Sequence, residues 1–399
     1  MLDNIKYQKS ILLLIVTLFW FSQYIYIPFQ TPYLTGINVS TSLIGTIVGA
    51  YGISQLIVRL PLGIAADCVN KHKLFIFLGS LIAGLASLIR LFFPSGYGFL
   101  LASLMSGCAS ATWISFMVFY TNFYPSNKQQ FATSKIIMFN NIGILIAFLF
   151  GTLFFDNLGM NTICIFSSIA GVCGAILSLF IKESKKQSHN SISLKSLIGV
   201  CSNKRLIFFG CLALIQQGIQ MSTTMSFTTQ ILEDLGATSA LIGYASITYM
   251  ICAVIFSRLS SCKFFENLGP KICIPSVFFM LSLYCILVPI VNNIYLIFIL
   301  QIIPGMATGI LFSYITSEAM KNVPLNKKST SMGFFQAIYA LGMTTFPVLT
   351  GNIAEYFSIK YSYFTLAIIC YLALAASIFY YNFYLIKYKN SSSNNNLAN

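Results

Sequence analysis

Long apolar runs alternate with short polar links along nearly the whole chain, and this pattern limits what the chain can fold into. A helix needs about 20 mostly apolar residues to cross the hydrocarbon core of a bilayer. Charged residues make up only 8% of the 399 residues, whereas soluble globular domains contain about 25%. The sequence therefore predicts an all-α integral membrane protein with twelve transmembrane helices. The expected spans are Ser10–Pro28, Thr41–Leu62, Leu74–Phe93, Gly98–Thr121, Phe131–Phe155, Thr162–Ile181, Leu206–Ile231, Ala240–Ser260, Ile272–Val291, Ile294–Ser317, Ser329–Gly351 and Tyr361–Leu385.

A weak internal repeat divides the chain near its middle. Arg59 and Asp67 are eight residues apart, and so are Arg258 and Glu266, which follow them at an offset of 199 residues. The tripeptide Leu-Ile-Gly at 43–45 recurs 198 residues later. A repeat of half a chain in a twelve-helix protein suggests two pseudo-symmetric six-helix halves related by an axis along the membrane normal. We expect an N-terminal half over residues 1–182, a cytoplasmic linker over 183–205, a C-terminal half over 206–389 and a disordered tail over 390–399.

The basic residues indicate which side of the membrane each link faces. If the N-terminus is cytoplasmic, every Lys and Arg except Arg90 and Lys360 lies in a cytoplasmic link or at a cytoplasmic helix end. Cytoplasmic segments of membrane proteins carry an excess of Lys and Arg. We therefore expect a multi-pass protein of the cytoplasmic membrane with both termini in the cytoplasm. The net charge of +14 is spread over small clusters between the spans, so no nucleic-acid partner is expected.

The link after the second expected span carries an unusual set of charges. Asp67 follows Gly63 by four residues, and Lys71 and Lys73 come four and six residues after the acid. This spacing resembles the loop between helices 2 and 3 of the major facilitator superfamily, a large family of secondary transporters. The family usually has a basic residue directly after the acid, where this chain has Cys68. The expected twelve spans, the mid-chain linker and the repeated halves extend the resemblance over nearly the whole chain.

The resemblance implies a two-lobed bundle with a central cavity that opens alternately to each side of the membrane. It also implies that the acid and the bases of this link clamp the two halves together in the outward-open state, while the glycine allows close helix contact. The alternative is an ordinary link whose charges only set the orientation. The implied gating residues are Arg59, Gly63, Asp67, Lys71 and Lys73, with Arg258 and Glu266 as the weaker copy in the second half.

Polar side chains occur at intervals inside the apolar spans. Polar groups are costly in lipid, so such residues usually face a bundle interior or a cavity. Gln216 and Gln220, for example, are four residues apart and share one helix face. The alternative is that these residues form hydrogen bonds between helices without binding any solute. The residues expected to line a solute cavity are Gln23, Tyr24, Tyr51, Gln55, Trp113, Asn140, Asn141, Gln216, Gln217, Gln220, Tyr249, Tyr314, Gln336 and Tyr339.

Ionisable side chains inside the spans are scarce, which limits the candidates for ion coupling. Proton-driven members of the resembled family often carry an Arg four residues before a glycine in helix 4, but here Ser103 precedes Gly107 at that spacing. This departure argues against proton-coupled drug export. Glu318 is the best candidate for coupling because it ends a span near the expected cavity mouth; the alternative is a helix-end acid that pairs with Lys321. Arg90 is expected to extend its charge to the outer interface.

These features predict a secondary transporter that moves a small organic solute across the cytoplasmic membrane by alternating access. The few charges in the spans favour a neutral or zwitterionic solute over a polyanion. An efflux pump for amphipathic drugs or toxic compounds is the alternative, because aromatic residues form 15% of the chain and suit adaptable apolar binding. A remote alternative is a non-transporting membrane sensor or a membrane-embedded enzyme, which should show a soluble output domain or a paired nucleophile and base.

No catalytic or metal-binding pattern stands out in the sequence. It contains no H-E-x-x-H, G-x-S-x-G or P-loop motif. The 11 cysteines are dispersed without a C-x-x-C pair. We therefore expect no enzymatic activity, no cofactor and no metal site. The expected partners are a small-molecule substrate, the lipid bilayer and, for a coupled carrier, an ion, and the protein is expected to be a monomer.

The orientation can be tested by cysteine labelling. In a Cys-free background, Lys186→Cys and Asp234→Cys place single thiols in the expected linker and in an expected outside link. A membrane-impermeant maleimide applied to intact cells should label position 234 and leave position 186 unlabelled, because only the first thiol faces the medium. The reverse labelling pattern would overturn the expected orientation.

Overall fold

A computed structural model of the protein describes residues 2–39, 41–69, 71–183, 199–324 and 327–384. Every regular element within these ranges is helical, and 12 helices are long and apolar enough to cross a membrane. The predicted fold class and number of spans are thus confirmed. Residues 184–198 of the expected linker and the expected tail over 390–399 lie outside the described residues.

Several spans are built from more than one element. The elements up to residue 178 are α1 (Leu2–Tyr24), α2 (Ile27–Gly36), α3 (Thr41–Val69), α4 (His72–Phe92), α5 (Gly96–Ala111), α6 (Trp113–Thr121), η1 (Ser126–Lys128) and α7 (Gln129–Ser178). The later elements are η2 (Gly199–Ser202), α9 (Lys204–Ser222), η3 (Thr223–Phe227), α10 (Thr228–Asp234), α11 (Ser239–Leu259), α12 (Lys263–Leu287), α13 (Ile294–Leu300), α14 (Ile302–Met306), η4 (Ala307–Leu311), α15 (Phe312–Met320), α16 (Lys328–Tyr356), α17 (Ile359–Phe379) and η6 (Tyr380–Tyr384).

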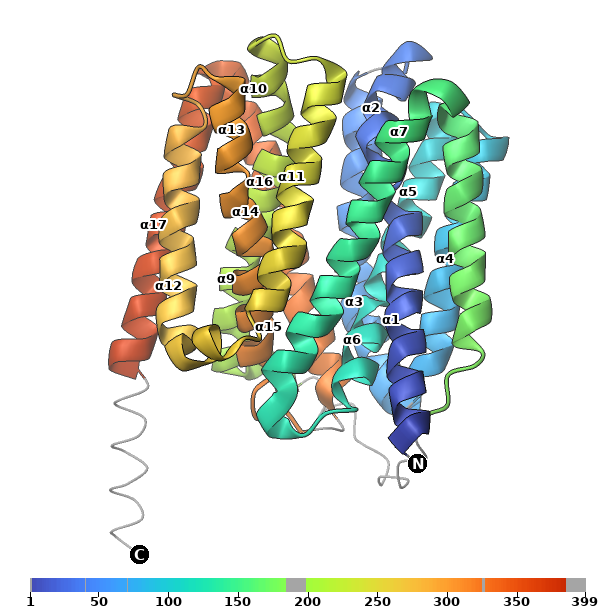
Figure 1. The fold of residues 1–399 in the computed structure, drawn as a ribbon, viewed down its shortest axis with the longest axis vertical. Coiled ribbons are helices and arrows are strands. Elements are labelled where there is room, and N and C mark those ends of the chain that lie inside the picture. The colour runs from blue at the N-terminus through green and yellow to red at the C-terminus, as the bar shows by residue number, and fades with distance from the viewer. Residues whose placement is uncertain (1, 40, 70, 184–198, 325–326, 385–399) are drawn as a thin grey trace, which may run out of the picture.

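Figure 1 shows the elements from α1 to α7 on one side of the molecule and those from α9 to α17 on the other. We call them the N-terminal group and the C-terminal group. The end of the bundle at which α1 begins lies at the bottom of Figure 1 and is called the lower end; the opposite end is the upper end. The two groups meet mainly along two helix pairs, α3 with α16 and α7 with α11.

The second span is longer than the sequence suggested, and this corrects one expectation. The helix-breaking link was expected to begin at Gly63, but α3 continues without interruption to Val69. Gly63 and Asp67 therefore lie in the last turns of a helix rather than in a loop. The residues between them are Ile-Ala-Ala, and alanine has the highest helix propensity, which outweighs the single glycine. The helix direction carries both residues toward the first turn of α16.

Two glycines make sharp turns inside elements that are otherwise helical. The fifth and sixth spans are joined within α7 at Gly159, which has a φ of 71°. Gly269 has a φ of 68° and separates the first turns of α12 from the span that follows. Residues with a side chain rarely adopt this left-handed conformation, whereas glycine does so at little cost. Each turn changes the chain direction without a long polar loop.

The outer surface of the bundle is apolar over its middle. Large hydrophobic side chains point away from the protein on many helices, for example Ile57 on α3, Leu153 on α7 and Ile368 on α17. A soluble protein rarely exposes so continuous an apolar surface. Contact with lipid explains this surface, because apolar side chains that face lipid tails are not exposed to water. The polar side chains lie mostly between helices, so a functional site is expected inside the bundle.

Candidate functional site

A cavity lies between the two groups near the middle of the bundle. Helices α1, α3, α6 and α7 line it from the N-terminal group, and α9, α11, α15 and α16 with η3 and η4 line it from the C-terminal group. Its volume of about 60 Å³ has room for only a few water molecules. The lining residues are Trp20, Tyr24, Tyr51, Gln55, Arg59, Trp113, Ile137, Asn140, Asn141, Ile144, Gln217, Gln220, Met225, Tyr249, Met250, Thr308, Phe312, Tyr339 and Met343.

Most of the polar residues singled out in the sequence come together in this lining. Four do not. Gln23 donates to the carbonyl of Ser106, and Tyr314 donates to the carbonyl of Phe265, so both serve contacts between neighbouring helices. Gln216 and Gln336 are buried beside the cavity but do not line it. The residues that do line it are Tyr24, Tyr51, Gln55, Trp113, Asn140, Asn141, Gln217, Gln220, Tyr249 and Tyr339.

Sequence reasoning missed several lining residues. Trp20 packs edge to face against Trp113, with ring centroids 5.3 Å apart. It lies on the same helix as Tyr24, four residues earlier, and this shared face was the signal that could have identified it. The apolar members, such as Met225 and Phe312, gave no such signal because they resemble the lipid-facing residues around them. Arg59 was assigned to the gate and not to the cavity.

On the C-terminal side of the cavity, three side chains form a closed ring of hydrogen bonds. Gln220 Nε2 donates to the hydroxyl of Tyr249 at 2.6 Å, and that hydroxyl lies 2.9 Å from the hydroxyl of Thr308. Thr308 Oγ1 in turn donates to Gln220 Oε1 at 3.3 Å, and Gln216 Nε2 donates to the same oxygen at 3.2 Å. The ring joins α9, α11 and η4, so it fixes the polar surface that this group presents to the cavity.

Arg59 is the cation of the cavity, and it joins the two groups. Its side chain is 2% exposed. Nη1 donates to the backbone carbonyl of Gln336 at 2.8 Å, and the guanidinium lies 4.5 Å from the ring centroid of Tyr339. On its own helix, Nη2 donates to Gln55 Oε1. Among the described residues, no carboxylate lies within ion-pair distance of this guanidinium.

Asp67 holds the first turn of α16 through three hydrogen bonds. Its carboxylate accepts from the backbone N–H of Ser329 at 3.1 Å, from the backbone N–H of Thr330 at 2.6 Å and from the Thr330 hydroxyl at 2.7 Å. The first N–H groups of a helix lack partners within the helix, and the positive end of the helix dipole favours an anion there. Asp67 of one group therefore acts as a cap for a helix of the other group.

Two glycines allow α3 and α16 to approach this closely. A methyl group on Gly63 would lie 2.6 Å from the carbonyl oxygen of Ser329, and one on Gly333 would lie 2.6 Å from that of Arg59. Carbon and oxygen atoms do not approach to that distance, and both obstacles are backbone atoms that cannot turn aside. Any larger side chain at either glycine would therefore separate the two helices.

Further hydrogen bonds join the groups on the lower side of the cavity. Asn141 Nδ2 donates to the hydroxyl of Ser257 at 2.9 Å, between α7 and α11. Ser260 Oγ donates to Ser134 Oγ at 2.8 Å, nearer the lower end. Lys328 Nζ donates to Gln129 Oε1 at 3.1 Å. Together with Asp67, these contacts close the lower end of the bundle.

Among the described residues, none of the bases of the expected gate forms an ion pair or a side-chain hydrogen bond with Asp67. Lys71 is exposed. Lys73 stays within its own group, where its N–H donates to Glu183 Oε1 at 2.8 Å and its Nζ donates to the carbonyl of Leu179 at 2.6 Å. The second-half pair, Arg258 and Glu266, is exposed at the lower end, and no ion pair joins the two in the described part of the chain. The acid binds backbone N–H groups because it lies opposite a helix start and not opposite a base.

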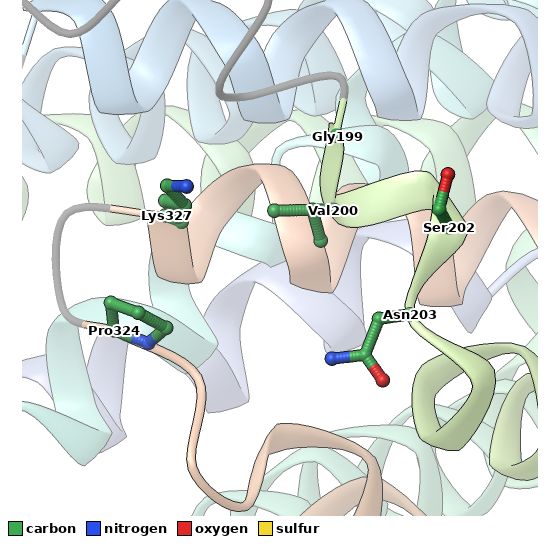
Figure 2. Close-up of a pocket in the computed structure, with 6 residues that line it drawn as sticks. All are labelled: Gly199, Val200, Ser202, Asn203, Pro324 and Lys327. Atoms are coloured by element: carbon green, nitrogen blue, oxygen red, sulfur yellow. The ribbon is translucent and has the colours of Figure 1, made fainter.

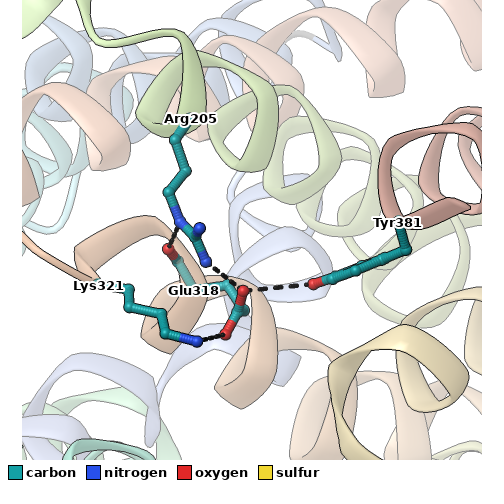
Figure 3. A network of polar contacts seen from close by, with 4 residues as sticks. All are labelled: Arg205, Glu318, Lys321 and Tyr381. Carbon is teal, nitrogen blue, oxygen red and sulfur yellow. Dashed lines mark hydrogen bonds and ion pairs between the residues drawn. The ribbon is translucent and has the colours of Figure 1, made fainter. Parts of the chain in front are cut away.

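Glu318, the expected coupling residue, belongs to a separate cluster away from the cavity (Figure 3). Its carboxylate forms an ion pair with Arg205 of α9 and lies 3.5 Å from Lys321 Nζ. The Tyr381 hydroxyl donates to the same carboxylate at 3.4 Å, and Arg205 Nε donates to the Glu318 carbonyl at 2.7 Å. The arrangement fixes three helix ends of the C-terminal group to one another. It agrees with the alternative of a helix-end acid, with Arg205 as an additional partner.

The expectation that Arg90 extends its charge to the outer interface is not met. The side chain does not reach an interface, since only 1% of it is exposed. Its guanidinium lies 3.8 Å from the ring centroid of Tyr26, and Nη2 donates to Ser106 Oγ at 3.0 Å. All these residues belong to the N-terminal group. The close fit of α4 against α5 holds the charge inside the group, where it contacts a ring face and a hydroxyl.

A wider hollow of about 490 Å³ lies on the lower surface, between η2 and the segment that leads to α16. Figure 2 shows its lining, which includes Asn203, Pro324 and Lys327. The hollow is open and shallow, and its residues do not come from both sides of the interface between the groups. The described residues also contain no group of three or more His, Cys, Asp or Glu side chains that could hold a metal ion. The central cavity is therefore the candidate site.

Comparison with known proteins identifies a family that matches nearly the whole chain. The sequence model described as "Major Facilitator Superfamily" matches residues 12–230 and again 210–397. An uncharacterised MFS-type transporter of Methanocaldococcus jannaschii is 22% identical over 358 residues, which cover 84% of this chain and 88% of that protein. An uncharacterised transporter of Buchnera aphidicola is 28% identical over 172 residues, which cover 42% of this chain and 43% of that protein.

Solved structures share the fold. The human organic anion transporter MFSD10 aligns with a TM-score of 0.78 at 12% identity, covering 94% of this chain and 99% of that one. The transporter FucP in its outward conformation aligns with a TM-score of 0.78 at 13% identity, with the same coverage. At such low identity the likeness concerns the arrangement of the helices and not the solute.

The Glu318 cluster generates a prediction about stability. Glu318→Gln and Arg205→Gln should each lower the free energy of unfolding by about 1–3 kcal/mol, because each leaves a partly buried partner unpaired. The double variant should lose less than the sum of the two, with a coupling energy of about 0.5–3 kcal/mol. Thermal unfolding of the purified protein in detergent measures all three. Lys321→Gln, at an exposed position, is the control with a small effect. Strictly additive losses would contradict the pairing.

Proposed function

The chain belongs to the Major Facilitator Superfamily and is a membrane transporter, and we propose that it carries a small organic solute by alternating access through the central cavity. One observation supports this proposal above the others. The cavity is lined by both groups, and on its lower side it is closed by contacts that join the groups. Separation of the groups at one end would expose the cavity to that side of the membrane.

The size of the cavity supports a moving bundle. A volume of about 60 Å³ is far below the roughly 300–1,000 Å³ of sites that hold drug-sized ligands. An organic solute can enter only if helices move apart. We infer that the structure represents a closed state, and that rocking of the two groups about the cavity opens one end at a time.

Asp67 is proposed as part of the gate at the lower end, which we take to be the cytoplasmic end. Its hydrogen bonds to α16 form only while α3 and α16 are close, so they stabilise states in which this end is closed. A carboxylate at a helix N-terminus contributes about 1–2 kcal/mol. Such an energy changes the ratio of two conformations by a factor of roughly 5–30.

One observation supports the alternative of an efflux pump for amphipathic compounds. Met225, Met250 and Met343 line the cavity together with aromatic rings. Methionine is flexible and polarisable, and it adapts to apolar ligands of different shapes. This lining suits a carrier with several substrates as well as one with a single apolar solute.

Transport can be tested directly. The purified protein in proteoliposomes should accumulate or exchange members of a panel of radiolabelled organic anions, neutral solutes and cations, assayed with and without a pH gradient. We expect counterflow exchange of at least one compound above protein-free vesicles, because the cavity can bind the solute from either side. Accumulation driven by the gradient would indicate proton coupling, and exchange alone would indicate a uniporter or another ion. Failure of every compound in counterflow would contradict the proposal.

The gate predicts a change in conformational equilibrium that needs no substrate. Spin labels at Lys128→Cys and Lys263→Cys, in a Cys-free background, report the distance between the groups at the lower end. Asp67→Asn removes the charge that caps α16. It should therefore raise the ratio of conformations with a longer distance to those with a shorter distance by a factor of roughly 5–30. Pulsed electron–electron double resonance on the protein in nanodiscs measures this shift.

The control for the gate is Asp234→Asn, which changes an exposed acid of α10. It should leave the distances at the lower end unchanged. A distribution for Asp67→Asn identical to that of the parent protein would reduce the charged segment to a determinant of orientation.

A further inference from the structure

Four fully buried hydrogen-bond donors of the cavity lining lack partners. Arg59 Nε, Gln55 Nε2, Asn140 Nδ2 and Trp20 Nε1 are all buried without a hydrogen-bond partner. All four belong to residues of the cavity lining, and every side-chain atom of that lining that is fully buried without a partner is a donor. Buried polar groups are normally satisfied, and an unsatisfied donor is costly. A ligand that relieves this cost must supply acceptor atoms.

The lining also has an unbalanced positive charge. Arg59 is the one Lys or Arg among the lining residues, and no Asp or Glu is among them. Asp67 lies eight residues further along α3, about 12 Å away along the helix axis, and its carboxylate is bound to α16. An unpaired charge buried between helices is unfavourable unless a counter-charge arrives. A ligand with one negative charge would balance the site, whereas a dianion would leave a negative charge without a partner.

The contacts of Arg59 leave one edge of the guanidinium for such a ligand. Nη1 is engaged by the Gln336 carbonyl, and the ring of Tyr339 fixes the plane of the group. Nε has no partner, and Nη2 donates to a side chain, that of Gln55. A planar carboxylate binds two adjacent guanidinium N–H groups in a fork. On binding along this edge, it would release Gln55, whose amide could then donate to the same anion.

The rest of the lining is suited to an apolar body. Trp20, Trp113 and Tyr24 form one wall, with Trp20 edge to face against Trp113 and 5.5 Å from Tyr24 between ring centroids. Methionine side chains and Phe312 contribute further apolar surface. Aromatic faces and edges pack well against rings and branched chains.

We propose that the central cavity binds a monocarboxylate with an apolar or aromatic body, and that Arg59 receives its carboxylate. The proposal rests on the proposed function and narrows its small organic solute to an organic monoanion. This replaces the neutral or zwitterionic compound expected from the sequence. Because Arg59 also bonds to α16, the carboxylate binds at the contact between the two groups. Arg59 therefore sets the charge preference of the carrier.

The tryptophans provide a direct test of binding. The chain contains 2 tryptophans, Trp20 and Trp113, and both line the cavity. Intrinsic fluorescence of the purified protein in detergent at neutral pH therefore reports on this site. The probes are benzoate, phenylacetate and cyclohexanecarboxylate, each compared with its uncharged amide, and phthalate as a dianion. We expect saturable fluorescence changes for at least one acid, with binding about 10-fold or more tighter than for its amide and than for phthalate.

Variants of Arg59 separate the charge from the fold. Arg59→Gln should weaken binding of the acid about 10- to 100-fold and abolish the preference for acid over amide. Arg59→Lys should retain the preference in part, since it keeps the charge but loses the fork. Arg90→Gln is the matched control: it removes the other fully buried arginine, which does not line the cavity, and should leave the ratio of acid to amide affinity unchanged. The ratio of acid to amide affinity in the wild-type protein tests the preference for a carboxylate even if a variant does not fold.

Two outcomes overturn the proposal: an amide that binds as tightly as its acid, or no fluorescence change with any of the three carboxylates. These outcomes are distinct from failure of the transport proposal. A neutral solute that exchanges in proteoliposomes while the carboxylates do not bind would leave transport intact and refute the monocarboxylate site. Carboxylates that bind with the predicted preference while no compound exchanges would support the site and contradict the proposed transport by alternating access.

Discussion

The hydrocarbon core of a bilayer contains no water, so every backbone N–H and C=O group there must find its partner within the protein. Helices satisfy this demand along their length but leave the first N–H groups unpaired. In this protein α16 begins at the contact between the two groups, and Asp67 of α3 supplies the acceptors it needs. The lower closure of the bundle thus follows from the general requirement that a buried helix start be capped.

The two charges of α3 serve α16 in different ways. Asp67 faces the positive end of the helix dipole, whereas Arg59, two turns higher, bonds to a backbone carbonyl and lies over an aromatic ring of the same helix. They do not neutralise each other, because the helix separates them by about 12 Å. The close approach at Gly63 and Gly333 brings both within reach of α16. One helix pair therefore carries the proposed gate at its end and the charge of the cavity near its middle.

Much of the site could be inferred from the sequence, and the exceptions have physical reasons. Tyr24, Gln55 and Gln220 were recognisable because a polar side chain within an apolar span must face the protein interior. The same rule does not tell a cavity from a helix contact, so Gln23 and Tyr314 were assigned to a cavity that they do not line. The apolar lining residues could not be recognised from the sequence, since the same apolar side chains occur next to lipid and next to a solute.

The sequence by itself determined the membrane environment, the number of spans and the presence of a charged segment at the end of the second span, because each depends on local composition and spacing. Only the tertiary structure decided that Asp67 caps α16 and that Arg59 faces a cavity whose lining residues include no acid. It also decided that Glu318 belongs to a cluster with Arg205. These outcomes depend on which helix lies opposite each side chain, and residues 113 to 277 positions apart along the chain cannot be paired from local pattern alone.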